Sequence, residues 1–208
     1  MIAIGIDNGI KGCATAVEDC RMIDVARFKA AEPTRVFNMM CGTPLKDLLA
    51  RLQTDPRTIL ILLEDPAINQ GRGTTAHSIA STAASFGRVL LILEAAGIPT
   101  ENIHTCAAVS WQKLWWKTNL IKKDYKPSIG IAQNLFGETF IPKGCKKPDD
   151  GWTDAALMAY TLSNPELREK FLKDETERGI SKVKAKAKKK AQKIISDGEL
   201  RKLLGGYN

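Results

Sequence analysis

Two short apolar segments that each end in a carboxylate restrict the possible folds of this chain most strongly. Residues 2–6 read Ile-Ala-Ile-Gly-Ile and are followed by Asp7, and residues 59–63 read Ile-Leu-Ile-Leu-Leu and are followed by Glu64. Short apolar runs of this kind are typical of strands buried on both faces of a parallel sheet. Since α/β proteins place their functional sites at the carboxyl ends of such strands, Asp7 and Glu64 are candidate site residues.

Two further carboxylates lie at the start of a predicted helix. Asp150 and Asp154 are four residues apart at the beginning of the stretch 151–162, so both lie on one face of that helix. Carboxylates that gather in one place repel one another unless a positive charge separates them. Hard divalent cations with oxygen ligands, Mg²⁺ or Mn²⁺, are the usual counter-charge. The four acidic residues therefore predict a metal site.

The remaining segments predict an alternation of strands and helices. Strands are expected at 2–7, 12–18, 22–29, 58–64 and 102–108, and helices at 45–53, 77–96, 127–136 and 151–162. The segment from Asn8 to Gly12 is expected to form a tight turn between the first two strands. The helix before the fourth strand supplies a crossover connection, so that strand is expected to lie parallel to the first, with Asp7 and Glu64 as neighbours.

The helix expected at 77–96 is apolar on nearly all sides. It has small residues in its first half and large aliphatic residues in its second half. Such a helix is typically buried, and here the sheet and a partner subunit are both expected to cover it.

Composition places the chain among globular proteins with a single core. It has 44% hydrophobic and 26% charged residues, and its longest apolar runs reach only about six residues. Neither a membrane span nor a secretory leader is expected, which predicts a cytoplasmic protein. The five cysteines are scattered without a Cys-x-x-Cys pair, so reduced thiols are expected rather than disulfides or a zinc site.

Positive charge is concentrated at the C-terminus. Residues 166–208 carry an excess of six positive charges out of the total of +8, and seven lysines lie between residues 181 and 193. We therefore divide the chain into a main domain at 1–165 and a basic helical extension or tail at 166–208. One interpretation of the tail is a phosphate-binding arm that includes Lys186 and Lys189, and the other is a solvated tail without a binding role.

A second group of candidate nucleic-acid contacts lies in the middle of the chain. Residues 111–126 combine three tryptophans and a tyrosine with lysines, which suits base stacking and phosphate contact. The alternative is that at least one tryptophan belongs to the core and the lysines are ordinary surface residues. Arg72 lies in a glycine-bearing polar loop after Glu64 and is a candidate contact to the DNA backbone. The candidate lysines of this stretch are Lys113, Lys117, Lys122, Lys123 and Lys126.

With these elements in this order, the chain resembles the RuvC family of Holliday-junction resolvases within the RNase H-like superfamily, and most nearly its phage and poxvirus-type members. The resemblance covers about residues 1–163 and is carried by residues 4–9 (Ile-Gly-Ile-Asp-Asn-Gly), 63–65 (Leu-Glu-Asp), 84–89 with 97–99, and 150–157. The family usually has proline where this chain has Asn8. The resemblance implies an α/β fold with an RNase H-like mixed five-stranded sheet flanked by helices, here with a basic helical C-terminal extension.

The resemblance also implies the residues that bind metal. Asp7, Glu64 and Asp154 fall on metal ligands of the family, whereas the remaining position is either Asp150 or Asp149, because bacterial members commonly place their last two acidic residues three apart. Such enzymes hydrolyse phosphodiester bonds with two Mg²⁺ or Mn²⁺ ions about 3.5 to 4 Å apart, which Asp7 would bridge. Lys113 and Lys126 resemble basic positions near the scissile phosphate, and Lys113 is the candidate catalytic lysine.

The activity implied by the resemblance is symmetric nicking of four-way DNA junctions in recombination and repair. A junction has two-fold symmetry and needs two nicks, so a homodimer with two sites is expected, with the helix at 77–96 as the candidate interface. One alternative is a nuclease of the same fold with broader specificity for flaps, branched DNA or RNA/DNA hybrids. The other is a catalytically silent protein that binds nucleic acid.

Overall fold

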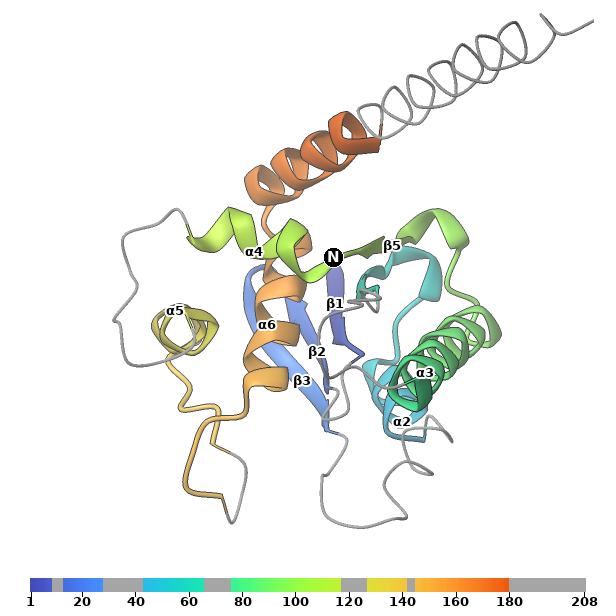
Figure 1. Cartoon of the computed structure of the whole chain (residues 1–208), viewed down its shortest axis with the longest axis horizontal. Coiled ribbons are helices and arrows are strands. Elements are labelled where there is room, and N and C mark those ends of the chain that lie inside the picture. The colour runs from blue at the N-terminus through green and yellow to red at the C-terminus, as the bar shows by residue number, and fades with distance from the viewer. Residues whose placement is uncertain (9–12, 28–42, 66–75, 117–126, 142–144, 180–208) are drawn as a thin grey trace, which may run out of the picture. The chain divides into compact units, whose positions relative to one another are not determined.

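Five strands form one mixed sheet in the order β3-β2-β1-β4-β5 (Figure 1). Its members are β1 (Ile2–Asp7), β2 (Cys13–Glu18), β3 (Arg21–Arg27), β4 (Leu60–Glu64) and β5 (Ile103–Cys106). The first three strands are antiparallel neighbours, whereas β4 is parallel to β1 and β5 is parallel to β4. The computed structural model describes residues 1–8, 13–27, 43–65, 76–116, 127–141 and 145–179. Within these residues the predicted meander and the predicted parallel crossover are both confirmed.

Helices cover both faces of the sheet. They are α2 (Thr43–Leu52), α3 (Ala76–Ala95), α4 (Ala108–Trp116), α5 (Pro127–Phe136) and α6 (Asp150–Ser163), with short 3-10 turns at Pro56–Thr58 and Thr100–Asn102. The helices predicted from the sequence are confirmed to within a few residues, and α4 is an addition. The strand expected from residue 58 begins at Leu60 because Asp55 caps the preceding 3-10 turn by accepting a hydrogen bond from the Arg57 amide.

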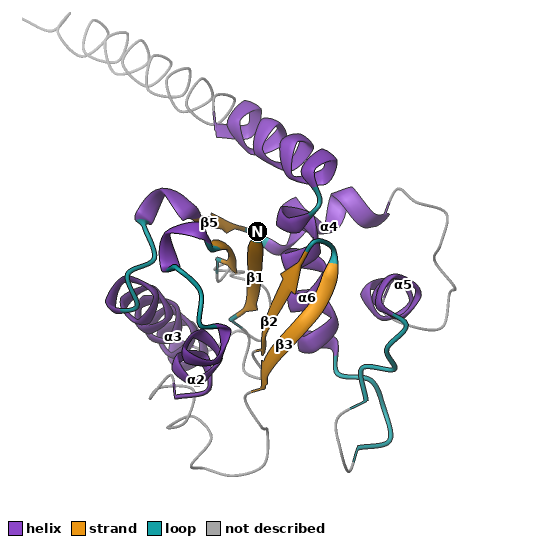
Figure 2. Cartoon of the chain, turned by 180° about the vertical axis from the view of Figure 1, so that it is seen from behind, coloured by secondary structure: helices purple, strands orange, loops and turns teal. Residues whose placement is uncertain are grey.

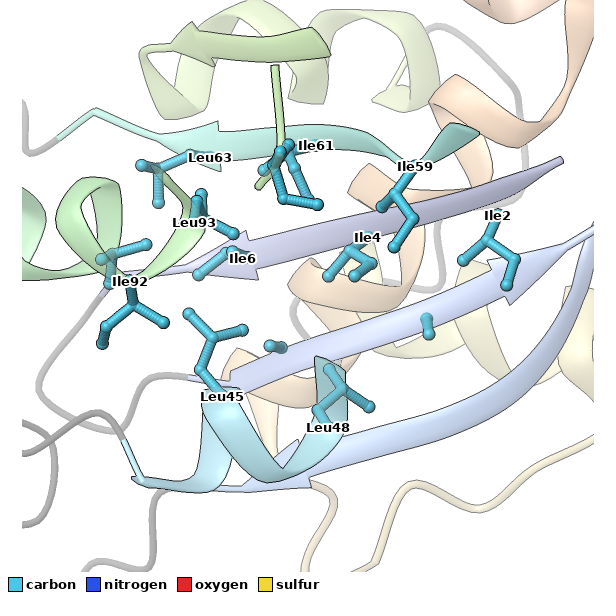
Figure 3. Close-up of a cluster of buried hydrophobic side chains, with 14 residues drawn as sticks. Ile2, Ile4, Ile6, Leu45, Leu48, Ile59, Ile61, Leu63, Ile92 and Leu93 are labelled. Atoms are coloured by element: carbon cyan, nitrogen blue, oxygen red, sulfur yellow. The ribbon is translucent and has the colours of Figure 1, made fainter. Parts of the chain in front are cut away.

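The even-numbered side chains of β1 form one apolar layer with α2 and α3. Alternation along a strand sends successive side chains to opposite faces, so this layer takes every second residue of β1 and β4. Its main members are Ile2, Ile4, Ile6, Ile61 and Leu63 from the sheet and Leu45, Leu48, Ile92 and Leu93 from the helices (Figure 3). All of them are buried, and this layer fixes the positions of β1 and β4 relative to α3.

The opposite face of the sheet is covered by α6, which crosses β1 and β2 (Figure 2). Gly5 makes this approach possible, because a Cβ atom added there would lie within 3.0 Å of backbone atoms of Ala155 and Ala159 and of the Met158 Cβ. Only a residue without a side chain allows two backbones to come so close. The helix therefore lies directly on the strand that ends in Asp7.

The chain divides into two compact units, Met1–Arg168 and Glu169–Asn208, and the sheet lies in the first. Residues 165–179 are helical, and the basic residues after them lie outside the described part of the chain. Among the helices that the structure describes, none has both the length and the apolar character needed to cross a bilayer. The four described cysteines are free thiols: Cys13, Cys20, Cys106 and Cys145.

Candidate metal centre

The carboxylates of Asp7 and Glu64 are brought together by the register of β1 and β4. Ile6 is paired with Leu63 in the parallel ladder, and Asp7 and Glu64 are the next residues along their strands. Both belong to the alternate set of side chains that includes Gly5 and faces α6. Both are also half-buried, because they lie where the sheet ends and the helix still covers it. The sequence prediction that these two residues are neighbours is thereby confirmed.

The third carboxylate comes from α6. Asp154 immediately precedes Ala155, whose backbone packs on Gly5, so the contact between helix and strand sets the position of Asp154. Burial raises the pKa of Glu64, and the negative charges of Asp7 and Asp154 contribute to raising it to about 7, although a hydrogen bond from Trp111 lowers it. Asp7, Glu64 and Asp154 are therefore close enough to repel one another in the absence of a counter-ion.

Asp149 and Asp150 occupy different positions at the start of α6. Asp149 is the N-cap of the helix, and its side chain accepts a hydrogen bond of 3.2 Å from the amide of Trp152. Asp150 is the first helical residue and lies one turn before Asp154 on the same face. The side chain of Asp149 is thus engaged in capping, which is a common use of aspartate at this position.

Trp111 contacts the cluster directly. Its indole Nε1 donates a hydrogen bond of 3.2 Å to Oε2 of Glu64, and its side chain is fully buried in the first half of α4. This contact was not predicted from the sequence, which grouped Trp111 with the lysines as a candidate base-stacking residue. Trp115 is buried as well and donates to the hydroxyl of Thr161 on α6. Both tryptophans therefore belong to the protein interior.

A second interaction that was not predicted lies behind Asp7. The hydroxyl of Ser85, on α3, donates a hydrogen bond of 2.7 Å to the side-chain carbonyl of Asn8, and both residues are buried. The sequence marks Asn8 only as a turn residue. The one available signal was its occurrence at a position where RuvC-like sequences usually have proline.

The donor set suits a hard divalent cation. It consists of carboxylate oxygens on three elements. Burial and, after it, repulsion by Asp7 and Asp154 raise the pKa of Glu64, and a cation relieves that repulsion. Within the described ranges, no three His, Cys, Asp or Glu side chains lie close enough to enclose a metal as they stand.

The predicted basic contacts are mostly beyond the described residues. Lys113 lies on the exposed side of α4, two residues after Trp111. No described interaction brings it to the carboxylates, and its catalytic role stays a prediction. The other predicted contacts fall outside the ranges that the structure describes: Arg72, Lys117, Lys122, Lys123, Lys126, Lys186 and Lys189.

Sheet order, strand directions and the position of α6 together define an RNase H-like fold of the RuvC type. The chain is similar to RuvC of T. thermophilus in complex with a Holliday junction substrate, with a TM-score of 0.54 at 18% identity over 78% of this chain and 93% of that chain. It is also similar to a second Thermus thermophilus RuvC structure, with a TM-score of 0.53 and the same identity and coverage. No protein-family model and no curated protein sequence matches the chain significantly.

Proposed function

We propose that this protein is a metal-dependent endonuclease that nicks four-way DNA junctions as a symmetric homodimer. The observation that carries the proposal is the convergence of Asp7, Glu64 and Asp154 from β1, β4 and α6, at which the pKa of Glu64 is raised to about 7. A buried cluster of like charges is costly to the fold, so it points to a cation-binding role. The fold shared with RuvC supports nuclease chemistry at this position.

In the proposed site Asp7, Glu64 and Asp154 would hold two Mg²⁺ or Mn²⁺ ions. Asp150 completes the ligand set, which the capping role of Asp149 supports. When bound, the two metal ions supply an activated water as nucleophile and stabilise the leaving 3′ oxygen. The protein itself orients the carboxylates and shields them from solvent on the α6 side. Lys113 is the proposed partner of the scissile phosphate.

Four-way junctions are the proposed substrate for two reasons. The sequence resembles phage and poxvirus-type resolvases at the motifs that contain Asp7, Glu64 and Asp154, and a similar solved structure is a RuvC protein in complex with a Holliday junction substrate. The excess of basic residues at 166–208 provides affinity for polyanions of any shape. The cluster alone does not select among nucleic acids, so substrate choice has to be measured.

The proposed dimer is formed through α3. One face of this helix packs on the sheet through Val89, Ile92 and Leu93, whereas Leu91 on the opposite side is 63% exposed. Ala80 and Ala84 are also exposed and lie on the same side as Leu91 at helical spacing. Small residues followed by a large aliphatic one allow two copies of α3 to approach closely. A two-fold axis between these copies would give the dimer two metal centres, one for each nick in the junction.

The test is cleavage of a labelled four-way junction beside a matched duplex, a flap and an RNA/DNA hybrid, in Mg²⁺ and in Mn²⁺. Asp7→Asn is the inactive variant. Asp19→Asn is the matched control, because Asp19 is a carboxylate in the exposed turn between β2 and β3. We expect paired symmetric nicks on the junction by the wild type and by Asp19→Asn, and none by Asp7→Asn.

Other outcomes separate the alternatives. Equal or faster cutting of duplex, flap or hybrid would replace the junction by a broader class of substrates while leaving the metal centre in place. Cutting that survives in Asp7→Asn would reject the metal centre. Binding without any metal-dependent cutting would mean that the fold serves only to bind nucleic acid.

A further inference from the structure

We propose that Trp111 is a positioning residue for the metal centre, which holds one oxygen of Glu64 in place so that the other remains available to a divalent cation. The inference rests on the proposed function, because it assigns a role within the same site. Its basis is the hydrogen bond of 3.2 Å from the indole Nε1 to Glu64 Oε2.

The position of Trp111 follows from the start of α4. β5 is parallel to β4 and pairs Cys106 with Glu64, so the chain leaves β5 at the same end of the sheet at which the carboxylates lie. The amide of Asp65 donates a hydrogen bond of 2.8 Å to the carbonyl of Cys106, which joins the two strand ends. The helix begins at Ala108, and Trp111 is within its first turn. Its side chain therefore reaches the end of β4.

The orientation of α4 is fixed by a second tryptophan on the same face. Trp115 follows Trp111 by four residues, and its indole Nε1 donates a hydrogen bond of 3.2 Å to the hydroxyl of Thr161 on α6. The ring of Trp115 also makes an edge contact with Tyr160, at 5.6 Å between centroids. One helix face is thus attached both to β4, through Glu64, and to α6, the helix that carries Asp154.

The chemistry of the indole suits this task. An indole N–H donates a single hydrogen bond and carries no formal charge, so it directs a carboxylate oxygen without competing with a cation for it. A lysine or arginine in its place would form an ion pair with Glu64 and neutralise the charge that attracts a metal. Because Trp111 is fully buried, water does not replace it as the donor at Oε2.

The test uses the four indole N–H resonances of the protein in a Mg²⁺ titration followed by nitrogen–proton NMR. Spectra of Trp111→Phe and Trp115→Phe assign two of them. Trp115→Phe is the matched control, since Trp115 lies on the same helix, is buried and donates a hydrogen bond to a residue outside the carboxylate cluster. We expect the Trp111 resonance of the wild type to shift saturably with Mg²⁺ and the Trp115 resonance to stay in place.

Calorimetry of Mg²⁺ binding is the second measurement. Loss of a hydrogen-bond partner of a metal ligand typically weakens metal affinity by about 10- to 100-fold, which is the expectation for Trp111→Phe, whereas Trp115→Phe should bind as the wild type does. The positioning role would be overturned if the Trp111 resonance does not shift with Mg²⁺ while other resonances shift saturably. It would also be overturned if a folded Trp111→Phe binds Mg²⁺ with unchanged affinity. The wild-type titration decides the question even if that variant does not fold.

Failure of the proposed function has a different signature. If no resonance of the wild type responds saturably to Mg²⁺ and calorimetry detects no binding, the metal centre itself is rejected, and the role of Trp111 with it. If Mg²⁺ binds but the Trp111 resonance does not shift, only the positioning role is rejected.

Discussion

Ser85 and Asn8 are 77 residues apart in the sequence, and the Ser85 hydroxyl donates a hydrogen bond of 2.7 Å to the Asn8 side chain. The bond joins the middle of α3 to the residue that follows Asp7. Both partners are buried, so neither has ready access to water as a substitute. The end of β1 is therefore fastened on one side by α6, through Gly5, and on the other by α3.

Removal of this hydroxyl should destabilise the protein measurably. Ser85→Ala removes one hydrogen bond from the buried side chain of Asn8, and loss of a buried hydrogen bond typically costs about 1 to 3 kcal/mol in the free energy of unfolding. Urea denaturation at equilibrium measures the loss. Asn8→Ala and the double variant complete a thermodynamic cycle, and the costs of the two single changes should not add, because both remove the same bond. Simple additivity would show that the two residues stabilise the fold independently.

Glu64 should make the metal-free protein less stable as pH rises. Its pKa is about 7 in the folded protein against an ordinary value of 4.5, so the folded state holds the proton more tightly than the unfolded state does. The stabilisation by this proton is fully present below pH 4.5 and is lost as pH rises through 7, with a slope of at most about 1.4 kcal/mol per pH unit. Thermal or urea unfolding in the presence of a chelator measures it.

Glu64→Gln is the control for that titration. Glutamine keeps an acceptor for Trp111 but has no charge to titrate, so this variant should lack the decline. The difference in stability between the wild type and Glu64→Gln gives the contribution of Glu64 alone, because His104, whose pKa is lowered by burial, titrates in both proteins. A wild type that runs parallel to Glu64→Gln between pH 4.5 and 8 would contradict the raised pKa.

Gly5 should tolerate no side chain. Gly5→Ala places a Cβ atom against the backbone of Ala155 and Ala159, so α6 has to move away from β1. Overpacking of this kind typically costs about 1 to 3 kcal/mol, and a backbone contact belongs at the upper end or beyond. Gly130→Ala, within α5, is the matched control, because its Cβ atom meets nothing within 4 Å and alanine favours the helix by about 0.5 to 1 kcal/mol. Denaturant midpoints should move in opposite directions.

Asp149 and Asp150 should differ in their effect on metal binding. Asn is as good a helix cap as Asp, so Asp149→Asn should keep both stability and Mg²⁺ affinity. Asp150→Asn should weaken Mg²⁺ binding by at least about tenfold, as loss of a proposed ligand does. Calorimetry with each variant provides the comparison. If Asp149→Asn weakens Mg²⁺ binding and Asp150→Asn does not, the metal ligand is Asp149 rather than Asp150.

A charge on the exposed side of α3 should dissociate the proposed dimer. Leu91→Glu places a carboxylate near the proposed two-fold axis, where it would repel the same carboxylate of the partner subunit. We therefore expect a monomer by light scattering after gel filtration. Ile23→Glu is the control, since Ile23 is 45% exposed on β3, a different element. A wild type that is already monomeric at the concentrations used for cleavage would argue against α3 as an interface.

Much of the fold was predictable because its signals are local. Apolar runs that end in Asp7 and Glu64 marked the central parallel strands, and the crossover between them implied the register that makes these residues neighbours. The start of α6 was predicted to within one residue, at 151 against Asp150 in the structure. These features depend on periodicity, capping and chain connectivity, which a single sequence contains.

The contacts around the cluster were not predictable for a physical reason. Whether Trp111 meets a base, a core side chain or Glu64 depends on the angle at which α4 leaves β5, and no local pattern encodes that angle. Gly5 is similar, because a glycine within a strand looks merely unfavourable until the helix that packs on it is known. The partner of Asn8 also lies far along the chain, on α3.

α6 lies on one face of the sheet, and the apolar layer formed with α2 and α3 lies on the other. This placement separates two kinds of evolutionary constraint. Substitutions among the aliphatic residues between the sheet and α2 or α3 alter stability but leave the spacing between Asp7 and Asp154 to a contact on the far side of β1. A lineage can therefore exchange most of that layer, one volume-conserving step at a time, without re-optimising its chemistry.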